Sequence, residues 1–169
     1  IQINLSRPEE QETIRALGWT GEWPKPDAFD QTALIGANLA GQKSDASIRE
    51  TVAHDVTIDA QGAVQATVTL DRAHAANKGD LFYGANNVQY LRLYTPAGTT
   101  LVDGSGFETP ANSFFKAQET GVIPFPDLAS STESVAFGGQ SVDLLQEGGR
   151  QVFGGWIQLR PQAEKETRM

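Results

Sequence analysis

Two histidines, His54 and His74, are the first candidates for acid–base or metal chemistry in this chain. No H-E-x-x-H segment joins them, and no G-x-S-x-G segment supplies the exposed serine of a hydrolase. His54 falls among the apolar positions of an alternating segment, and His74 stands in a polar segment without an evident partner. The chain has no cysteine, which removes thiolate metal sites and thiol nucleophiles. Neither imidazole therefore predicts a catalytic or metal site.

The carboxylates and the glycine-rich segments give only weak indications of a catalytic or ligand-binding site. Residues 36–44 (GANLAGQKS) resemble a phosphate-binding loop, but a glutamine separates the second glycine from the lysine that should follow it directly. The turn at Asp103 lacks the alternating acidic residues of a calcium loop. Glu108 paired with Glu119 or Asp127 leaves glycoside cleavage open until the distances are known. We predict no catalytic residue, no metal and no cofactor, and hence a chain that is not an enzyme.

The amino-acid composition limits the kinds of molecule that this chain can bind. With 13 basic against 21 acidic residues, the formal net charge of −8 disfavours nucleic acid and anionic membrane surfaces, which attract clustered lysine and arginine. No stretch approaches the roughly 18 apolar residues that span a bilayer. Seventeen glycines and eight prolines indicate many turns and short elements.

The elements expected to position these residues are mostly strands. Residues 1–5 predict a short strand, and Ser6 with Glu9 has the spacing of a capping box that begins a helix ending at Gly18. The clearest pattern is a hairpin in which apolar and polar residues alternate on both sides of a turn at 59–62, which predicts one buried face. The expected strands are 32–39, 51–58, 64–71, 88–94, 99–103, 135–137, 141–145 and 150–159.

This pattern predicts a mainly β fold: an antiparallel β-sandwich, immunoglobulin-like or related, with one short N-terminal helix. Residues 1–31 should form a strand, a helix and a tryptophan-rich loop packed on the main domain, residues 32–159 the sandwich, and residues 160–169 a charged tail. The strand order does not follow from the sequence. Because the chain opens on Ile1 and its single methionine is Met169, we expect it to be part of a longer protein.

Several segments in register resemble the C-terminal part of bacterial proteins classed as domain of unknown function 4012. They are IQINLSRPEEQ (1–11), LGWTG (17–21), ANLAGQKSD (37–45), YLRLYTPAGT (90–99) and VFGGW (152–156). The resemblance implies an extracytoplasmic protein of the bacterial cell envelope, usually anchored by an N-terminal membrane segment, and it implies no established activity. The family usually continues past the equivalent of Trp156 with an apolar strand. This chain continues into charged residues, so we expect an incomplete sandwich.

The resemblance also singles out candidate binding residues. Asn38, Lys43 and Asp45 match the segment N-L-x-x-x-K-x-D, and Arg92 matches R-x-Y-x-P-x-G. The first three are the side chains of a ligand site or, more simply, of a loop held by side-chain hydrogen bonds. We expect Arg92 to lie between Tyr90 and Tyr94 on one strand face. Its guanidinium then either stacks on the two rings or binds an anionic glycan.

Three functions remain open. The first is a non-catalytic structural or interaction module of a cell-envelope protein, whose partners are other envelope proteins or the rest of its own precursor. The second is a domain that binds carbohydrate or an envelope polymer, with Tyr83, Tyr90 and Tyr94 as stacking platforms. The third is a subunit of a surface filament or layer that self-associates when a neighbour's strand completes an open sheet edge.

Overall fold

The computed structural model describes residues 3–22, 31–115, 121 and 133–169. The chain divides into two compact units, residues 1–30 and residues 31–169. The larger unit is an antiparallel β-sandwich, and the smaller one carries the single short helix, so the predicted fold class is confirmed. The predicted packing of residues 1–31 on the main domain stays a prediction.

The N-terminal unit contains α1 (Pro8–Ala16). The predicted capping box is wrong: Pro8 occupies the first helical turn, the N-cap is therefore Arg7, and no side chain caps the helix. Gly18, at φ +70°, ends the helix as predicted. Residues 3–5 form no strand, although the Ile3 amide donates to the carbonyl of Trp19 at 2.9 Å. Trp23, the second tryptophan of the predicted tryptophan-rich loop, lies outside the described residues.

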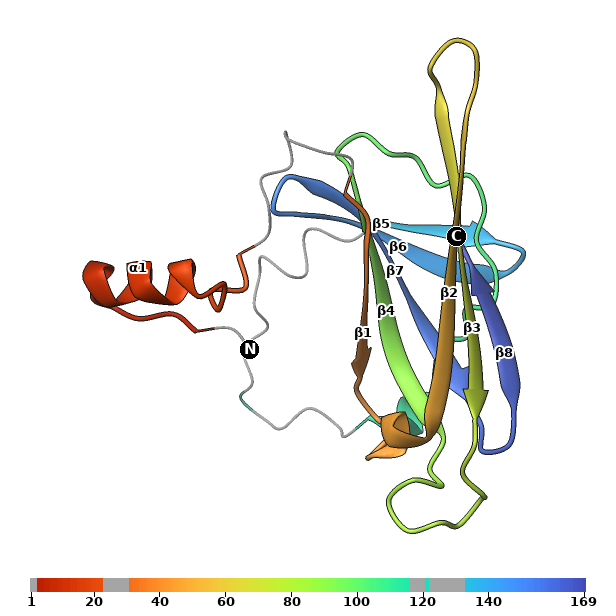
Figure 1. Ribbon diagram of the computed structural model, residues 1–169. Coiled ribbons are helices and arrows are strands. Elements are labelled where there is room, and N and C mark those ends of the chain that lie inside the picture. Colours follow the sequence, from red (N-terminus) through yellow and green to blue (C-terminus); the bar gives the residue numbers. More distant parts are fainter. Residues whose placement is uncertain (1–2, 23–30, 116–120, 122–132) are drawn as a thin grey trace. The chain divides into compact units, whose positions relative to one another are not determined.

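The larger sheet has five strands in the order β1-β4-β7-β6-β5, all antiparallel to their neighbours. Its strands fan out from β1 to β5, which shows the twist of the sheet (Figure 1). Their bounds are β1 (Ala33–Asn38), β4 (Asn87–Thr95), β5 (Glu133–Phe137), β6 (Gln140–Glu147) and β7 (Arg150–Leu159). Each overlaps a predicted strand.

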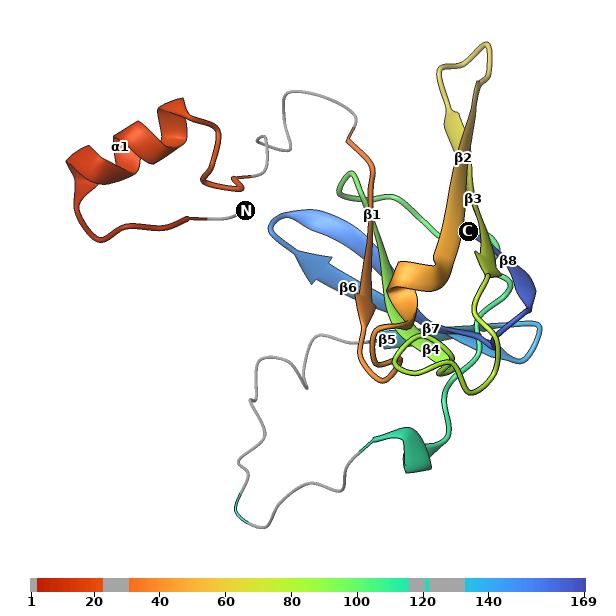
Figure 2. The ribbon, with the colours of Figure 1, turned by 60° about the horizontal axis from the view of Figure 1, so that its bottom comes forward.

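The smaller sheet has the order β2-β3-β8, with β2 (Ile48–Ile58), β3 (Val64–His74) and β8 (Glu164–Arg168). Figure 2 shows it as a separate layer beside the larger sheet. Two 3-10 helices, η1 (Ser44–Ser47) and η2 (Asn112–Phe114), lie in the connections. The strand predicted at 99–103 does not form. Instead Ser105 makes an isolated bridge to Arg168.

The core fills the space between the two sheets. Its buried members are Val68, Leu70, Leu91, Leu93, Phe107, Val142, Phe153, Ile157 and Met169. Two adjacent glycines of β7 let large rings approach both faces of that strand. A Cβ on Gly155 would overlap the Phe107 ring, and one on Gly154 would overlap the Tyr90 hydroxyl.

The C-terminal residues contradict the prediction of a charged tail. Glu164–Arg168 is a strand that pairs with β3, and the side chains of Thr167 and Met169 are buried. Along β8 the exposed charged residues alternate with Lys165 and Thr167, which point inward. Because these two inward residues are polar, the period-two pattern of a strand is not visible in the sequence. The expectation that the sandwich lacks a strand after β7 is therefore wrong: a polar strand, β8, follows β7 and pairs with β3.

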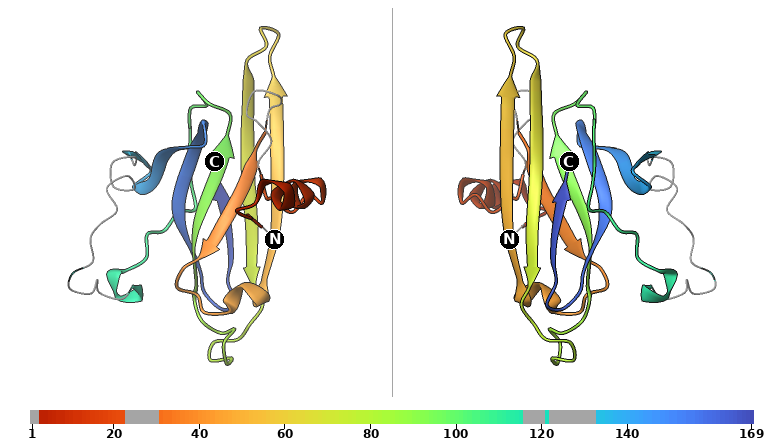
Figure 3. Two further views of the ribbon diagram at one scale, coloured as in Figure 1. Left: turned by 90° about the vertical axis from the view of Figure 1, so that its left-hand side faces the viewer. Right: turned by 90° about the vertical axis from the view of Figure 1, so that its right-hand side faces the viewer.

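The hairpin of β2 and β3 is longer than predicted, and it projects beyond the rest of the sandwich (Figures 1 and 3). We call its outer half, residues 52–66, the arm. Every residue of the arm is exposed. The prediction that one face of this hairpin is buried holds only near the base, where Val68 and Leu70 of β3 meet the larger sheet.

Candidate functional site

The three residues singled out in the loop after β1 do not converge on a ligand site. Asn38 closes the loop on itself, because its Oδ1 accepts the Gly41 amide at 2.6 Å. Lys43 is exposed and its amine lies 5.3 Å from the centre of the Phe82 ring. Asp45 turns the other way and accepts the Asn87 side-chain amide at 2.6 Å. The arrangement is that of a loop held by its own side chains.

Asn87 belongs to a buried polar network between the sheets, which the sequence analysis missed. Its Nδ2 donates to Ser44 Oγ at 2.9 Å as well as to Asp45, and its Oδ1 accepts from Arg72 Nη2 at 3.0 Å. Arg72 Nε donates to Glu50 at 3.0 Å. Burial lowers the pKa of Arg72, and the Glu50 carboxylate opposes this shift.

A sequence signal for this network did exist. In β3, Arg72 and His74 continue the face that carries Val68 and Leu70, so the period-two pattern places a charged and a polar group inward. His74 is buried rather than in a polar loop without a partner. Its Nδ1 accepts the Ala76 amide at 3.3 Å, so Nε2 carries the proton and donates to the Ala85 carbonyl at 3.0 Å.

The outer face of the larger sheet carries a second polar cluster. Tyr90, Arg92 and Tyr94 do share one face of β4, as predicted, on the side away from the core. The Tyr90 hydroxyl donates to Asp143 at 2.6 Å. Arg92 Nη1 lies 3.2 Å from Glu147, and its guanidinium lies 5.5 Å from the centre of the Tyr94 ring.

Burial and neighbouring carboxylates hold both tyrosines in the neutral form. Burial is the larger cause of the raised pKa of Tyr90, and its hydrogen bond to Asp143 adds to the shift. The pKa of Tyr94 is raised to about 12 by burial and by its hydrogen bond to Glu147. These hydroxyls therefore act as hydrogen-bond donors within the sheet and not as bases.

A row of tyrosines for stacking sugars does not form. Tyr94 is buried at 7% exposure, and the edge of the Tyr90 ring packs on Trp156 with centroids 5.1 Å apart. Tyr83 is exposed but lies in the loop between β3 and β4, away from the face that carries the other two. The stacking mechanism expected for a carbohydrate-binding domain thus has no platform in these three rings.

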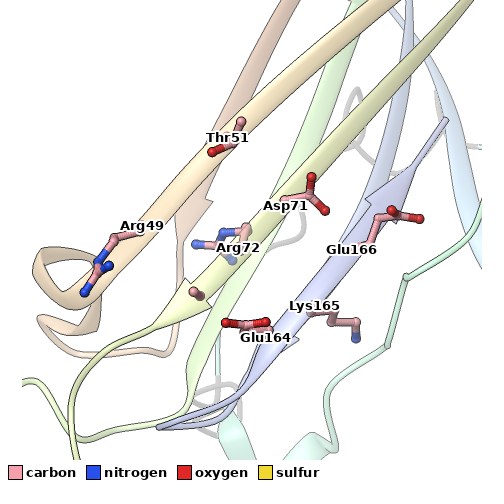
Figure 4. A pocket seen from close by; sticks show the side chains of 8 residues that line it. Arg49, Thr51, Asp71, Arg72, Glu164, Lys165 and Glu166 are labelled. Carbon is pink, nitrogen blue, oxygen red and sulfur yellow. The ribbon is translucent and has the colours of Figure 1, made fainter.

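The outer face of the smaller sheet is hollowed (Figure 4). The hollow is open, and the side chains that line it include Arg49 and Thr51 of β2, Asp71 of β3, and Glu164 and Glu166 of β8. No aromatic ring lines it, so it offers no platform on which a sugar could stack. Carboxylates of β3 and β8 face one another across it, and Arg49 lies at its β2 side.

The arm is the one described surface on which large apolar side chains gather along a single strand face. The exposed fractions are 50% for Val52, 47% for Val56, 69% for Ile58 and 56% for Val64. These positions continue the core face of β3, whose Leu70 is 1% exposed. An apolar face that continues past the core without a cover is typical of an interaction surface.

The carboxylate pairing that left glycoside cleavage open stays untested. Glu108 binds Lys165 at 2.9 Å, while Glu119 and Asp127 lie outside the described residues. Among the described residues, no three histidine or carboxylate side chains come together in a way that fits a metal ion. The helices in the described part of the chain are too short and too polar to cross a bilayer.

Comparisons with models of protein families, with curated proteins and with solved structures gave no match to this chain. The class defined by fold and surface is an antiparallel β-sandwich with a projecting hairpin.

Proposed function

We propose that this chain is a non-catalytic interaction module of an extracytoplasmic bacterial cell-envelope protein, and that it docks other envelope components through the arm. The envelope location is supported by the resemblance of its motifs to the domain of unknown function 4012. The docking role is supported by one observation above all: a two-stranded arm that leaves four large apolar side chains open to solvent.

The polar clusters support a non-catalytic role. Nucleophiles and general bases need a free, accessible atom near a place for substrate. Here the best candidate groups bind one another: Tyr90 with Asp143, and Arg92 with Glu147. The same contacts stiffen the sandwich, and a stiff body suits the task of holding an arm at a fixed position.

The test is site-specific photo-cross-linking in cells that express the protein from its own gene. A photoreactive residue at Ile58, in the arm, is compared with one at Leu81, which is 76% exposed and lies in the loop between β3 and β4. That loop is at the end of the sandwich opposite the arm (Figure 1). We expect discrete adducts from position 58 and at least about tenfold fewer from position 81. Equal yields at both positions, or none at either, contradict the docking role.

A second measurement addresses catalysis. The purified chain is incubated with peptidoglycan and with envelope polysaccharide, and soluble products are measured. We expect no release. Release that an Asp143→Asn or Glu108→Gln substitution abolishes would overturn the non-catalytic part of the proposal.

A further inference from the structure

The edge of the smaller sheet at β2 is long, and it lacks three of the devices that commonly protect an edge strand. β2 has 11 residues, whereas the other sheet edges, β1, β5 and β8, have six, five and five. Every residue of β2 is described, and the strand contains no proline, no lysine and no bulge in its register with β3. Natural proteins use these devices to keep edges from pairing. By contrast, β8 is short and highly charged, and Ser105 bridges its free side.

Alternate residues of β2 form backbone hydrogen bonds with β3, and the residues between them direct their backbone N–H and C=O groups to the open edge. Two bonds bracket the ladder with β3: the Asp59 amide donates to Ala63 at 3.0 Å, and the Ala75 amide donates to Ser47 at 2.9 Å. Odd-numbered residues of β2 therefore exchange bonds with β3. Because the direction alternates along a strand, the even-numbered residues 48–58 present their N–H and C=O groups to the open edge.

This edge is complementary to itself. If two copies of β2 pair antiparallel about a two-fold axis at Val52, even-numbered residues meet even-numbered residues, as the hydrogen-bond phase requires. The opposed pairs are then Val52 with Val52, Arg49 with Asp55, Glu50 with His54, and Ile48 with Val56. Each charged side chain of β2 meets an opposite charge or a hydrogen-bonding partner, and the large apolar residues meet one another.

Shifting the two-fold axis to a neighbouring residue of β2 removes these favourable opposed pairs. An axis at Ala53 places Glu50 opposite Val56, and an axis at His54 places Glu50 opposite Ile58. Both bury a carboxylate against an apolar side chain. Charge complementarity therefore selects the axis at Val52.

Two of the side chains involved are free to make these contacts. Among the described residues, neither Arg49 nor Asp55 forms an ion pair within the chain. Both are exposed on the outer face of the smaller sheet. Glu50 binds Arg72 through one carboxylate oxygen, which leaves its other oxygen to accept from the partner's imidazole.

We infer that the partner of the arm is a second copy of this chain, bound by antiparallel pairing of β2 with β2 about Val52. The pairing joins the two smaller sheets into one continuous sheet through about ten backbone hydrogen bonds. Each arm then runs along the base of the other copy's β2, which brings its apolar face beside Ile48 of that strand. This inference rests on the proposed function in taking the arm as the interaction surface.

A single cysteine tests the register directly, because the chain has none of its own. Opposed residues of a hydrogen-bonded antiparallel pair have Cα atoms about 5.5 Å apart, within reach of a disulfide. In Val52→Cys, the two cysteines oppose each other on the axis. In the matched control Val56→Cys, they are eight positions out of register, roughly 27 Å apart. We expect mild oxidation to give a covalent dimer of the purified full chain at Val52→Cys, with at least about tenfold less at Val56→Cys.

Charge reversal gives a second, independent readout. Arg49→Asp and Asp55→Arg each place like charges opposite one another at both symmetry-related positions of the dimer. We expect each substitution to weaken dimerisation at least about tenfold, as measured by analytical ultracentrifugation. The double variant R49D/D55R restores the pairs in the opposite sense and should return to within about threefold of the unchanged chain. Loss of dimerisation in all three variants means either that they misfold or that the dimer uses another surface. Circular dichroism separates these two outcomes, because only misfolded variants lose the β-sheet spectrum.

The outcomes separate the two proposals. A monomer at millimolar concentration, or equal cross-linking at positions 52 and 56, overturns self-pairing. If the photoreactive residue at Ile58 then still captures a different protein in cells, the proposed docking function stands without the second copy. If it captures nothing, both fail.

Discussion

Arg72 of β3 donates from Nη2 to Asn87 Oδ1 of β4 at 3.0 Å, and this bond joins the two sheets inside the sandwich. The Arg72 side chain is 4% exposed, and its charge is compensated mainly by Glu50. Asn87 is fully buried and carries the connection onward to η1 through Ser44 and Asp45. The loop singled out by its resemblance is therefore fastened to the centre of the fold.

Replacing Asn87 tests this connection. Asn87→Ala leaves Arg72 Nη2 and the Asp45 carboxylate without their shared partner, and we expect a loss of about 2–3 kcal/mol in the free energy of unfolding. Urea denaturation measures it. The matched control is Asn77→Ala at an exposed position, which should change stability by less than about 0.5 kcal/mol. Similar values for both variants would show that the network contributes nothing to stability.

Two isoleucines test the difference between core and arm. Ile157 is 1% exposed and Ile58 is 69% exposed, although both lie in strands. We expect Ile157→Ala to cost about 2–5 kcal/mol, because it removes buried contacts and leaves a cavity. Ile58→Ala should cost less than about 0.5 kcal/mol in the monomer. A large loss at Ile58 in thermal or urea unfolding of dilute protein would mean that the arm is covered within the chain.

The close approach of Tyr90 to β7 predicts the effect of a methyl group at Gly154. A Cβ there would overlap the Tyr90 hydroxyl and lie 3.0 Å from the Tyr90 Cζ, so the ring must shift and its hydrogen bond to Asp143 is disturbed. We expect Gly154→Ala to cost about 1–3 kcal/mol in urea unfolding. In a Tyr90→Phe background the overlapping oxygen is gone, and the cost should fall. An identical cost in both backgrounds would place the strain elsewhere.

The tyrosine cluster predicts a loss of stability at alkaline pH. The folded protein raises the pKa of Tyr94 to about 12 and also raises that of Tyr90, whereas an unfolded tyrosine titrates near 10. Above about pH 10 the unfolded chain releases protons that the folded chain keeps, so the free energy of unfolding falls as pH rises. This contribution is complete below pH 10 and is lost as pH passes through the folded pKa.

The measurement is urea denaturation between pH 9 and pH 11.5. The variant Tyr90→Phe/Tyr94→Phe should show a shallower fall than the unchanged chain, because its unfolded state has fewer phenols to ionise. Equal slopes would mean that these two hydroxyls titrate alike in the folded and unfolded states.

Local patterns in the sequence determined much of this fold. Alternation of side chains located β2 and β3, and it placed Tyr90, Arg92 and Tyr94 on one face of β4, because period-two geometry is a property of the strand alone. Gly18 marked the end of the helix for an equally local reason, its left-handed backbone.

Tertiary structure decided the rest. Ile58 and Leu70 belong to the same alternating face, yet one is exposed and the other buried, because burial depends on whether the opposite sheet reaches that far. Residues 164–168 become a strand because β3 offers them an edge, which no local pattern shows. Likewise, the contacts of Asn38, Lys43 and Asp45 were set by partners distant in sequence or by loop closure. The residue types alone favoured a loop held by side-chain hydrogen bonds but left a ligand site open.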